Sequence, residues 1–92
     1  MTMNPGQPRW RASVTVLPKT GVNDPEGEAI LGGLRQLGYS SLSRVRAGRL
    51  FHVFIEAPDE AAALDQANRM ADQLLANPVI EQFSVAIEPA TE

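Results

Sequence analysis

Apolar and polar residues alternate between Trp10 and Leu17, and this alternation predicts a half-buried strand. Successive side chains of a strand point to opposite faces, so one face would be apolar and the other polar. The apolar face would carry Trp10, Ala12, Val14 and Val16, and the polar face Arg11, Ser13 and Thr15.

A helical pattern follows between Pro25 and Gly38. Asp24 can cap this helix, and Pro25 suits its first position, where a missing N–H costs nothing. Gly38 can end the helix in the left-handed conformation. The apolar residues then form one stripe at helical spacing: Ile30, Leu34 and Leu37, with Leu31 beside them.

Gly32 and Gly33 are unusual inside a helix, because each glycine costs about 1 kcal/mol relative to alanine. Two interpretations remain open at this stage. Either the sheet beneath runs close to the helix backbone, or a partner helix or subunit packs against the two glycines.

Residues 43–57 predict the longest strand of the chain. Their apolar positions are odd-numbered on both sides of Gly48: Val45, Ala47, Phe51, Val53 and Ile55. A two-residue hairpin loop at Gly48-Arg49 would reverse that parity. The pattern therefore favours one long strand bent at Gly48, with a three-residue loop as the alternative. Half of such a strand would overhang a domain of this size and would need another chain to cover it.

A second helix is expected from its cap, Asp59, to about Ala76, because Pro78 has no N–H to continue it. The apolar stripe of this helix would consist of Leu64, Ala67, Ala71, Leu74 and Leu75. The last strand would run from Val79 through Glu88 and carry Phe83, Val85 and Ile87 on one side.

In chain order these elements predict an α+β fold, β-α-β(β)-α-β, of ferredoxin-like type. The expected architecture is an antiparallel sheet with two helices packed on one face and a long bent central strand. A single domain would span residues 9–88. Residues 1–8 are expected to be a flexible N-terminal extension, and residues 89–92 a loose C-terminus.

The chain has 92 residues and no cysteine. About 80 residues form a core that is only marginally stable alone, and neither disulfides nor thiolate metal sites can add stability. A homo-oligomer, dimer or tetramer, is therefore expected. No apolar run reaches the ~18 residues of a membrane span and no signal peptide is evident, which predicts a soluble, cytoplasmic protein. The net charge of −3 argues against nucleic acid and membrane as partners.

The charge is divided unevenly between the two halves of the chain. Residues 1–49 hold seven cations against three acids, a net charge of +4, and residues 50–92 hold one cation against eight acids, a net charge of −7. One edge of the fold could simply be basic. Alternatively, a polarised surface could serve to dock unlike partners or opposing protomers.

Groups suited to catalysis are scarce. His52 is the only histidine, and Glu56 lies too far along the same strand to orient it, so a structural or interface role is favoured over catalysis. The acids are scattered, which argues against a metal site. Gly27, Gly32 and Gly33 lie within a helix, so they form no phosphate-binding loop. We predict no catalytic, cofactor-binding or metal-binding residues in this chain.

Arg44, Arg46 and Arg49 form the densest cationic group of the sequence. They could grip phosphate or carboxylate, or they could be edge-strand charges that block stray strand pairing. Aromatic residues make up 5% of the chain, too few for an RNA-stacking sheet. The candidate subunit contacts are Arg44, Arg46, Arg49, His52, Gly32 and Gly33.

Four segments carry the most distinctive sequence: Val22–Gly27 (VNDPEG), Gly38-Tyr39, Val45–Arg49 (VRAGR) and Leu74–Phe83 (LLANPVIEQF). At this spacing they resemble the PurS family, the smallest subunit of phosphoribosylformylglycinamidine (FGAM) synthase. The N-terminal extension, the Gly32-Gly33 pair and Leu50-Phe51-His52 depart from the family pattern, which leaves details of the surface open.

The resemblance implies a non-catalytic assembly subunit in de novo purine biosynthesis. In that ligase, a glutamine amidotransferase complex, a glutaminase subunit releases ammonia. A large synthetase subunit uses ATP to convert formylglycinamide ribonucleotide to the amidine. ATP, Mg and glutamine would be used by these partner subunits, and no cofactor by this chain. The chain would bridge the two partners, and an added role in ammonia transfer is left open.

The alternative is a small-molecule-sensing regulatory domain of ferredoxin-like fold, which would bind an amino acid or nucleotide at a dimer interface. A nucleic-acid-binding module is disfavoured, because the second half of the chain is acidic.

Overall fold

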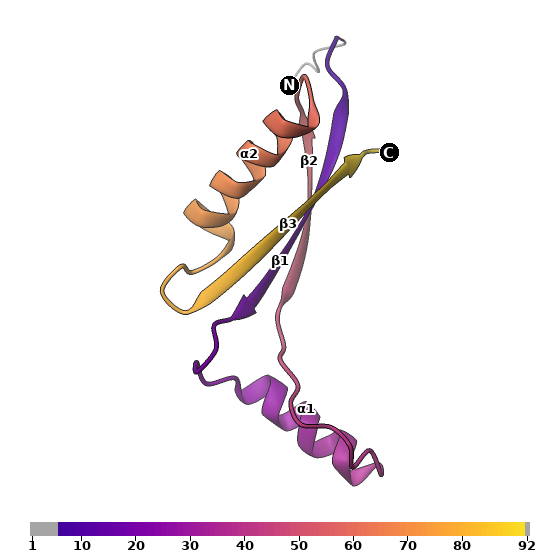
Figure 1. The fold of residues 1–92 in the computed structure, drawn as a ribbon, viewed down its shortest axis with the longest axis vertical. Coiled ribbons are helices and arrows are strands. Elements are labelled where there is room, and N and C mark those ends of the chain that lie inside the picture. The colour runs from indigo at the N-terminus through magenta and orange to yellow at the C-terminus, as the bar shows by residue number, and fades with distance from the viewer. Residues whose placement is uncertain (1–5, 92) are drawn as a thin grey trace.

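The computed structural model describes residues 6–91, which form a three-stranded antiparallel sheet and two α-helices (Figure 1). The strands are β1 (Arg9–Pro18), β2 (Arg49–Glu56) and β3 (Glu81–Pro89). They lie in the order β2-β1-β3, with β1 antiparallel to both neighbours. The α+β class with an antiparallel sheet is thus confirmed.

The alternation in β1 builds the core of the sheet. Ala12, Val14 and Val16 are fully buried, and Val14 lies between Phe51 of β2 and Val85 of β3. The predicted inward faces of all three strands are therefore confirmed. At one end of β1, Trp10 Nε1 donates a hydrogen bond of 3.0 Å to the carbonyl oxygen of Ala57.

Helix α2 (Glu60–Met70) covers one face of the sheet, and a single π-helical turn, η1 (Ala71–Leu75), continues it. Asp59 caps α2 as predicted, accepting a hydrogen bond from the Ala62 N–H. Three alanines face the strands and are fully buried: Ala63, Ala67 and Ala71. Such small side chains let the helix backbone approach the sheet closely.

The predicted stripe of this helix is confirmed at Ala67, Ala71 and Leu75 and was wrong at Leu64 and Leu74. Leu64 is 38% exposed and Leu74 is 84% exposed, whereas Ala63 and Met70 pack in or against the core. The π-helical turn accounts for the exposure of Leu74, since it widens the last turn by one residue and shifts the helical register at that point.

Helix α1 (Pro25–Gln36) does not pack on the sheet with α2, as expected from the sequence, but projects beyond its end (Figure 1). Its predicted ends are confirmed: Asp24 accepts a hydrogen bond from the Gly27 N–H, and Gly38 has a φ of 106°. An apolar stripe predicts that one face of a helix will be covered, but it does not identify what covers it. In residues 6–91 the sheet does not cover the stripe of α1. The molecule measures 54 × 28 × 22 Å as a result.

The prediction of a long bent central strand was also wrong. The central strand is β1, while β2 begins only at Arg49 and lies at an edge of the sheet. Residues 42–48 have no regular structure and run beside α1 (Figure 1). The reason is that Ala47 N–H donates to the Asp24 carboxylate instead of to a strand, and the ladder with β1 ends at Arg49.

The sheet hydrogen bonds extend further toward both chain ends than the sequence predicted. Ala57 N–H donates to the Pro8 carbonyl and Ala90 N–H to the Arg9 carbonyl, so Pro89 and Ala90 continue the β3 edge rather than forming a loose end. Of the predicted loose ends, residues 1–5 and 92 lie outside the described residues.

Candidate assembly surfaces and a cationic cavity

The face of the sheet opposite α2 has no helix over it in residues 6–91. It presents two large apolar side chains from β2, Leu50 at 59% exposed and Phe54 at 43% exposed. His52 lies between them, is exposed, and stands opposite Ser13 of β1. On this open face the exposed apolar side chains Leu50 and Phe54 flank the polar His52. Exposed large apolar side chains of this kind are typical of a surface that contacts another protein.

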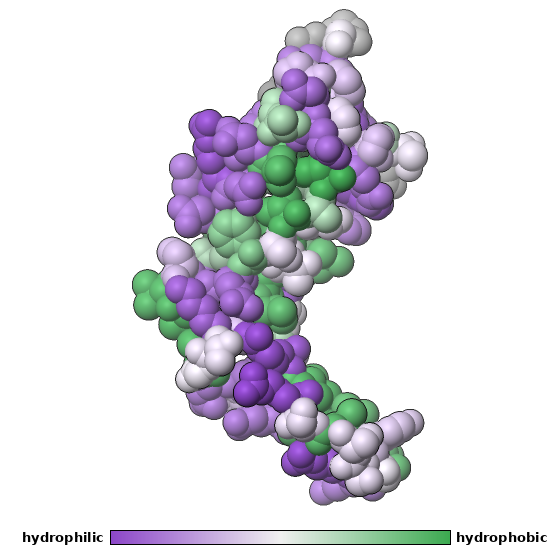
Figure 2. Space-filling view, viewed as in Figure 1, coloured by the Kyte–Doolittle hydropathy of each residue, from purple (hydrophilic) through white to green (hydrophobic). Residues whose placement is uncertain are grey.

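The stripe of α1 is the second open apolar surface. Ile30 is 42% exposed and Leu37 is 76% exposed, while Leu31 and Leu34 are half-buried. Figure 2 shows hydrophobic side chains on the projecting α1, apart from those that gather over the sheet. The helix therefore presents an amphipathic face that the described chain leaves largely in solvent.

Gly32 and Gly33 lie on this same helix, and a Cβ atom on either would have no neighbour within 4 Å. The interpretation that the sheet runs close beneath them is therefore wrong. Packing of a partner at the two glycines stays a prediction.

The three arginines of the cationic group separate in the structure. Arg49 Nη2 donates to both carboxylate oxygens of Glu81 at 2.9 Å, and its guanidinium lies 5.5 Å from the centre of the Phe51 ring. Arg49 thus stabilises the β-sheet within the chain. Arg44 and Arg46 lie outside the strands and line a cavity, so blocking of an exposed strand edge is not their role.

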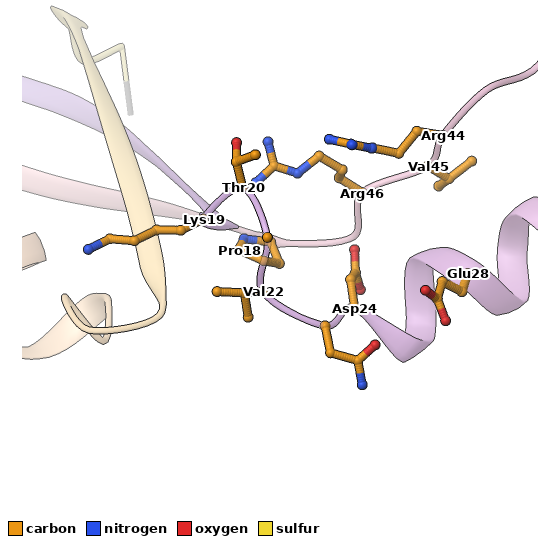
Figure 3. Close-up of a pocket in the computed structure, with 11 residues that line it drawn as sticks. Pro18, Lys19, Thr20, Val22, Asp24, Glu28, Arg44, Val45 and Arg46 are labelled. Carbon is orange, nitrogen blue, oxygen red and sulfur yellow. The ribbon is translucent and has the colours of Figure 1, made fainter.

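That cavity, which we call the cationic cavity, has a volume of about 390 Å³ and lies where α1 leaves the sheet (Figure 3). The β1–α1 loop forms one wall, and residues 44–46 form the other. Its lining consists of Pro18, Lys19, Thr20, Gly21, Val22, Asn23, Asp24, Glu28, Arg44, Val45 and Arg46. Lys19 turns away from it, since its Nζ donates to the Pro78 carbonyl at 2.6 Å.

Asp24 connects the two walls of the cavity. One of its carboxylate oxygens accepts from Gly27 N–H at 3.0 Å and the other from Ala47 N–H at 2.9 Å. The Ala47 and Gly27 hydrogen bonds, together with the positive charge of Arg46, hold the pKa of Asp24 below its usual value. Its role as a helix cap could be read from the sequence, but its bond to Ala47 could not.

We expect the link between α1 and residues 44–47 to weaken as the pH falls below about 4. A lowered pKa in the folded state means that the carboxylate adds stability above its unfolded pKa. That stability is lost as the pH falls through the folded pKa. Amide hydrogen exchange at Gly27 and Ala47, corrected for intrinsic rates, would measure the loss.

The Asp24→Asn variant is the control, since its amide does not titrate and protection at both amides should lose most of its pH dependence. Equal pH dependence in the variant and the wild type would contradict the assignment. The pKa of Glu81 is also lowered, chiefly by the hydrogen bond from the Asn77 N–H. Exchange at the Asn77 amide would report the titration of Glu81 separately from that of Asp24.

The structure offers no grouping suited to metal binding among residues 6–91. No three His, Cys, Asp or Glu side chains come together there to hold a metal ion. No helix of the described part is both long and apolar enough to cross a membrane. The sequence analysis did not find the cavity, which has Thr20 in its wall. It also missed the exposed apolar pair Leu50 and Phe54, although their even-numbered positions in the strand already placed them on the face away from the core.

These features define a small ferredoxin-like α+β domain whose open surfaces are suited to contact with other protein chains. Residues 11–89 match the family model PurS, described as phosphoribosylformylglycinamidine (FGAM) synthase. The chain belongs to the PurS family.

Relatives and solved structures agree with this membership. The FGAM synthase subunit PurS of Synechocystis sp. is 49% identical over 77 residues, which cover 84% of this chain and 75% of that protein. The subunit of Archaeoglobus fulgidus is 42% identical over 74 residues, covering 80% and 92%. The structure of Thermus thermophilus PurS has a TM-score of 0.82 at 33% identity and covers 90% of this chain and 99% of its own.

A chain in the structure of PurLQS from Thermotoga maritima is also similar, with a TM-score of 0.80 at 28% identity. The match covers 88% of this chain and 99% of that one. The predicted family resemblance is thus confirmed.

Proposed function

We propose that this chain is the non-catalytic assembly subunit of FGAM synthase and bridges the glutaminase and the large synthetase subunits. One observation carries the proposal: a chain of the PurS family presents two open apolar surfaces. The structure of a relative as part of PurLQS supports an assembly of unlike subunits.

The division of chemistry follows from the residues available. Transfer of ammonia from glutamine to an activated amide needs a nucleophile, a base and a phosphate-binding site. In this proposal the partner subunits supply these groups and use ATP, Mg and glutamine. The chain's contribution is contact geometry, which places the two partners close enough for ammonia to pass between them without mixing with bulk water. Its location is then the cytoplasm, with its substrates.

We further propose that the stripe of α1 is covered by a second copy of the chain. A chain of this size gains little stability from its own core, and the described part leaves Leu37 and Ile30 exposed. A second copy carries the same open face of the sheet and the same stripe of α1. When the same surfaces of two copies complement each other, they form a closed dimer.

Reconstitution from separately purified subunits tests the bridging function. The chain alone should neither hydrolyse glutamine nor consume ATP. Added to the glutaminase and synthetase subunits, it should be required for glutamine-dependent formation of the amidine product. With ammonium chloride as the nitrogen source the requirement should largely disappear, because free ammonia needs no bridge. Equal glutamine-dependent rates with and without the chain would reject the proposal.

A further inference from the structure

The cationic cavity contains a charged donor without an acceptor. Among the buried side-chain nitrogen and oxygen atoms of residues 6–91, Arg11 Nε and Arg46 Nη2 have no hydrogen-bond partner. Arg11 already pairs with Glu88 through another nitrogen, whereas Arg46 is in none of the ion pairs of the described chain. Arg46 acts on Asp24 through its charge, but no hydrogen bond satisfies its buried Nη2 in residues 6–91. A buried N–H group without an acceptor is unfavourable, so Nη2 calls for an acceptor from outside this part of the chain.

The groups beside Arg46 decide which acceptor fits. Lys19 and Asp24 are occupied by backbone partners, as described above. The remaining charges of the lining are the guanidinium groups of Arg44 and Arg46 and the carboxylate of Glu28. In Figure 3 the Arg46 side chain extends toward Thr20, with Arg44 alongside. Two guanidinium groups and a hydroxyl thus line the cavity, and the net charge of its lining is +1, from Lys19, Arg44 and Arg46 against Asp24 and Glu28.

We propose that the cationic cavity is an oxyanion site, which takes the phosphate group of a small phosphorylated molecule through Arg44, Arg46 and Thr20. Guanidinium groups bind phosphate through paired, charge-assisted hydrogen bonds. The volume of about 390 Å³ falls within the range of small-molecule sites. No aromatic residue lines the cavity to stack on a base, so the phosphate end of the ligand is the part recognised.

Titration of the full chain with inorganic phosphate at constant ionic strength, followed by NMR, tests the site. We expect saturable shifts confined to the amides of residues 20–24 and 44–46 and to the Arg44 and Arg46 side-chain N–H groups. Acetate, titrated in the same way, separates a phosphate site from one that accepts any carboxylate, and it should bind more weakly.

Three substitutions sharpen the test. Arg44→Gln should weaken phosphate binding about tenfold, as the loss of one charge-assisted hydrogen bond predicts. Glu28→Gln should tighten it by about 2- to 5-fold, because a like charge is removed from the lining, a gain that a merely structural role would not produce. Arg69→Gln is the matched control and should leave binding unchanged, since Arg69 pairs with Asp65 on the surface of α2.

The absence of saturable shifts at the cavity would overturn the proposal. So would equal binding of acetate, or equal losses in Arg44→Gln and Arg69→Gln, which would indicate general attraction to basic residues. Because binding is measured on this chain without the other subunits, its outcome is independent of the bridging function.

Discussion

Replacing Gly48 by alanine should destabilise the fold by about 3 kcal/mol, the range of an unrelieved steric clash in a packed region. A Cβ atom at this position would lie inside contact distance of the Val16 backbone carbonyl and 2.7 Å from Leu17 Cδ2. The carbonyl belongs to the central strand and cannot move without breaking the sheet. Thermal unfolding, followed by the fluorescence of Trp10, should show a Tm lowered by roughly 10–20 °C.

Gly33→Ala supplies the matched control for this substitution. Gly33 lies in the exposed interior of α1, and a Cβ atom there would meet nothing within 4 Å. The isolated chain should therefore gain about 0.5–1 kcal/mol from the higher helix propensity of alanine. An unchanged Tm in Gly48→Ala, or a loss in Gly33→Ala as large as that in Gly48→Ala, would contradict the structural account.

The Leu37→Glu substitution should separate folding from assembly. Leu37 is 76% exposed, so a charge there should leave the sheet and α2 intact. In the proposed dimer the same charge would be buried without a partner in the interface. We expect the dissociation constant of self-association to rise by at least about 100-fold. Sedimentation equilibrium over a range of concentrations would measure it.

Gln36→Glu is the corresponding control. It places the same charge one residue earlier, at the same end of α1, but on the face opposite the apolar stripe. Its effect on helix stability should match that of Leu37→Glu, and its effect on association should be small. If both variants associate as the wild type does, α1 does not form the contact with a second copy.

The sequence predicted best what depends on local geometry. The alternation around Val14 fixed which side of β1 faces the core, and Asp24, Pro25 and Gly38 fixed the ends of α1. These features follow from backbone geometry and single hydrogen bonds, which neighbouring residues determine. The family could be predicted for the same reason, since its most distinctive segments are short and contiguous.

The placement of α1 and of the cationic cavity depended on contacts that local patterns do not encode. An apolar stripe such as that around Leu34 indicates a covered face, but it does not say whether the cover comes from the same chain. The bond from Ala47 N–H to Asp24 joins residues 23 positions apart and ends a strand that parity alone would have extended. Val79 was similarly expected to begin the last strand, but it donates to the Asn77 side chain within a turn and is 78% exposed.

The central position of β1 has a consequence for biosynthesis. β1 leaves the ribosome before β2 and β3, the two strands that must join it, and Trp10 of β1 pairs with Pro89 of β3. Pairings so distant in sequence form slowly, and β1 cannot complete its second ladder until β3 has been released. A nascent chain stalled before β3 would therefore display a bare apolar strand, a natural target for chaperones.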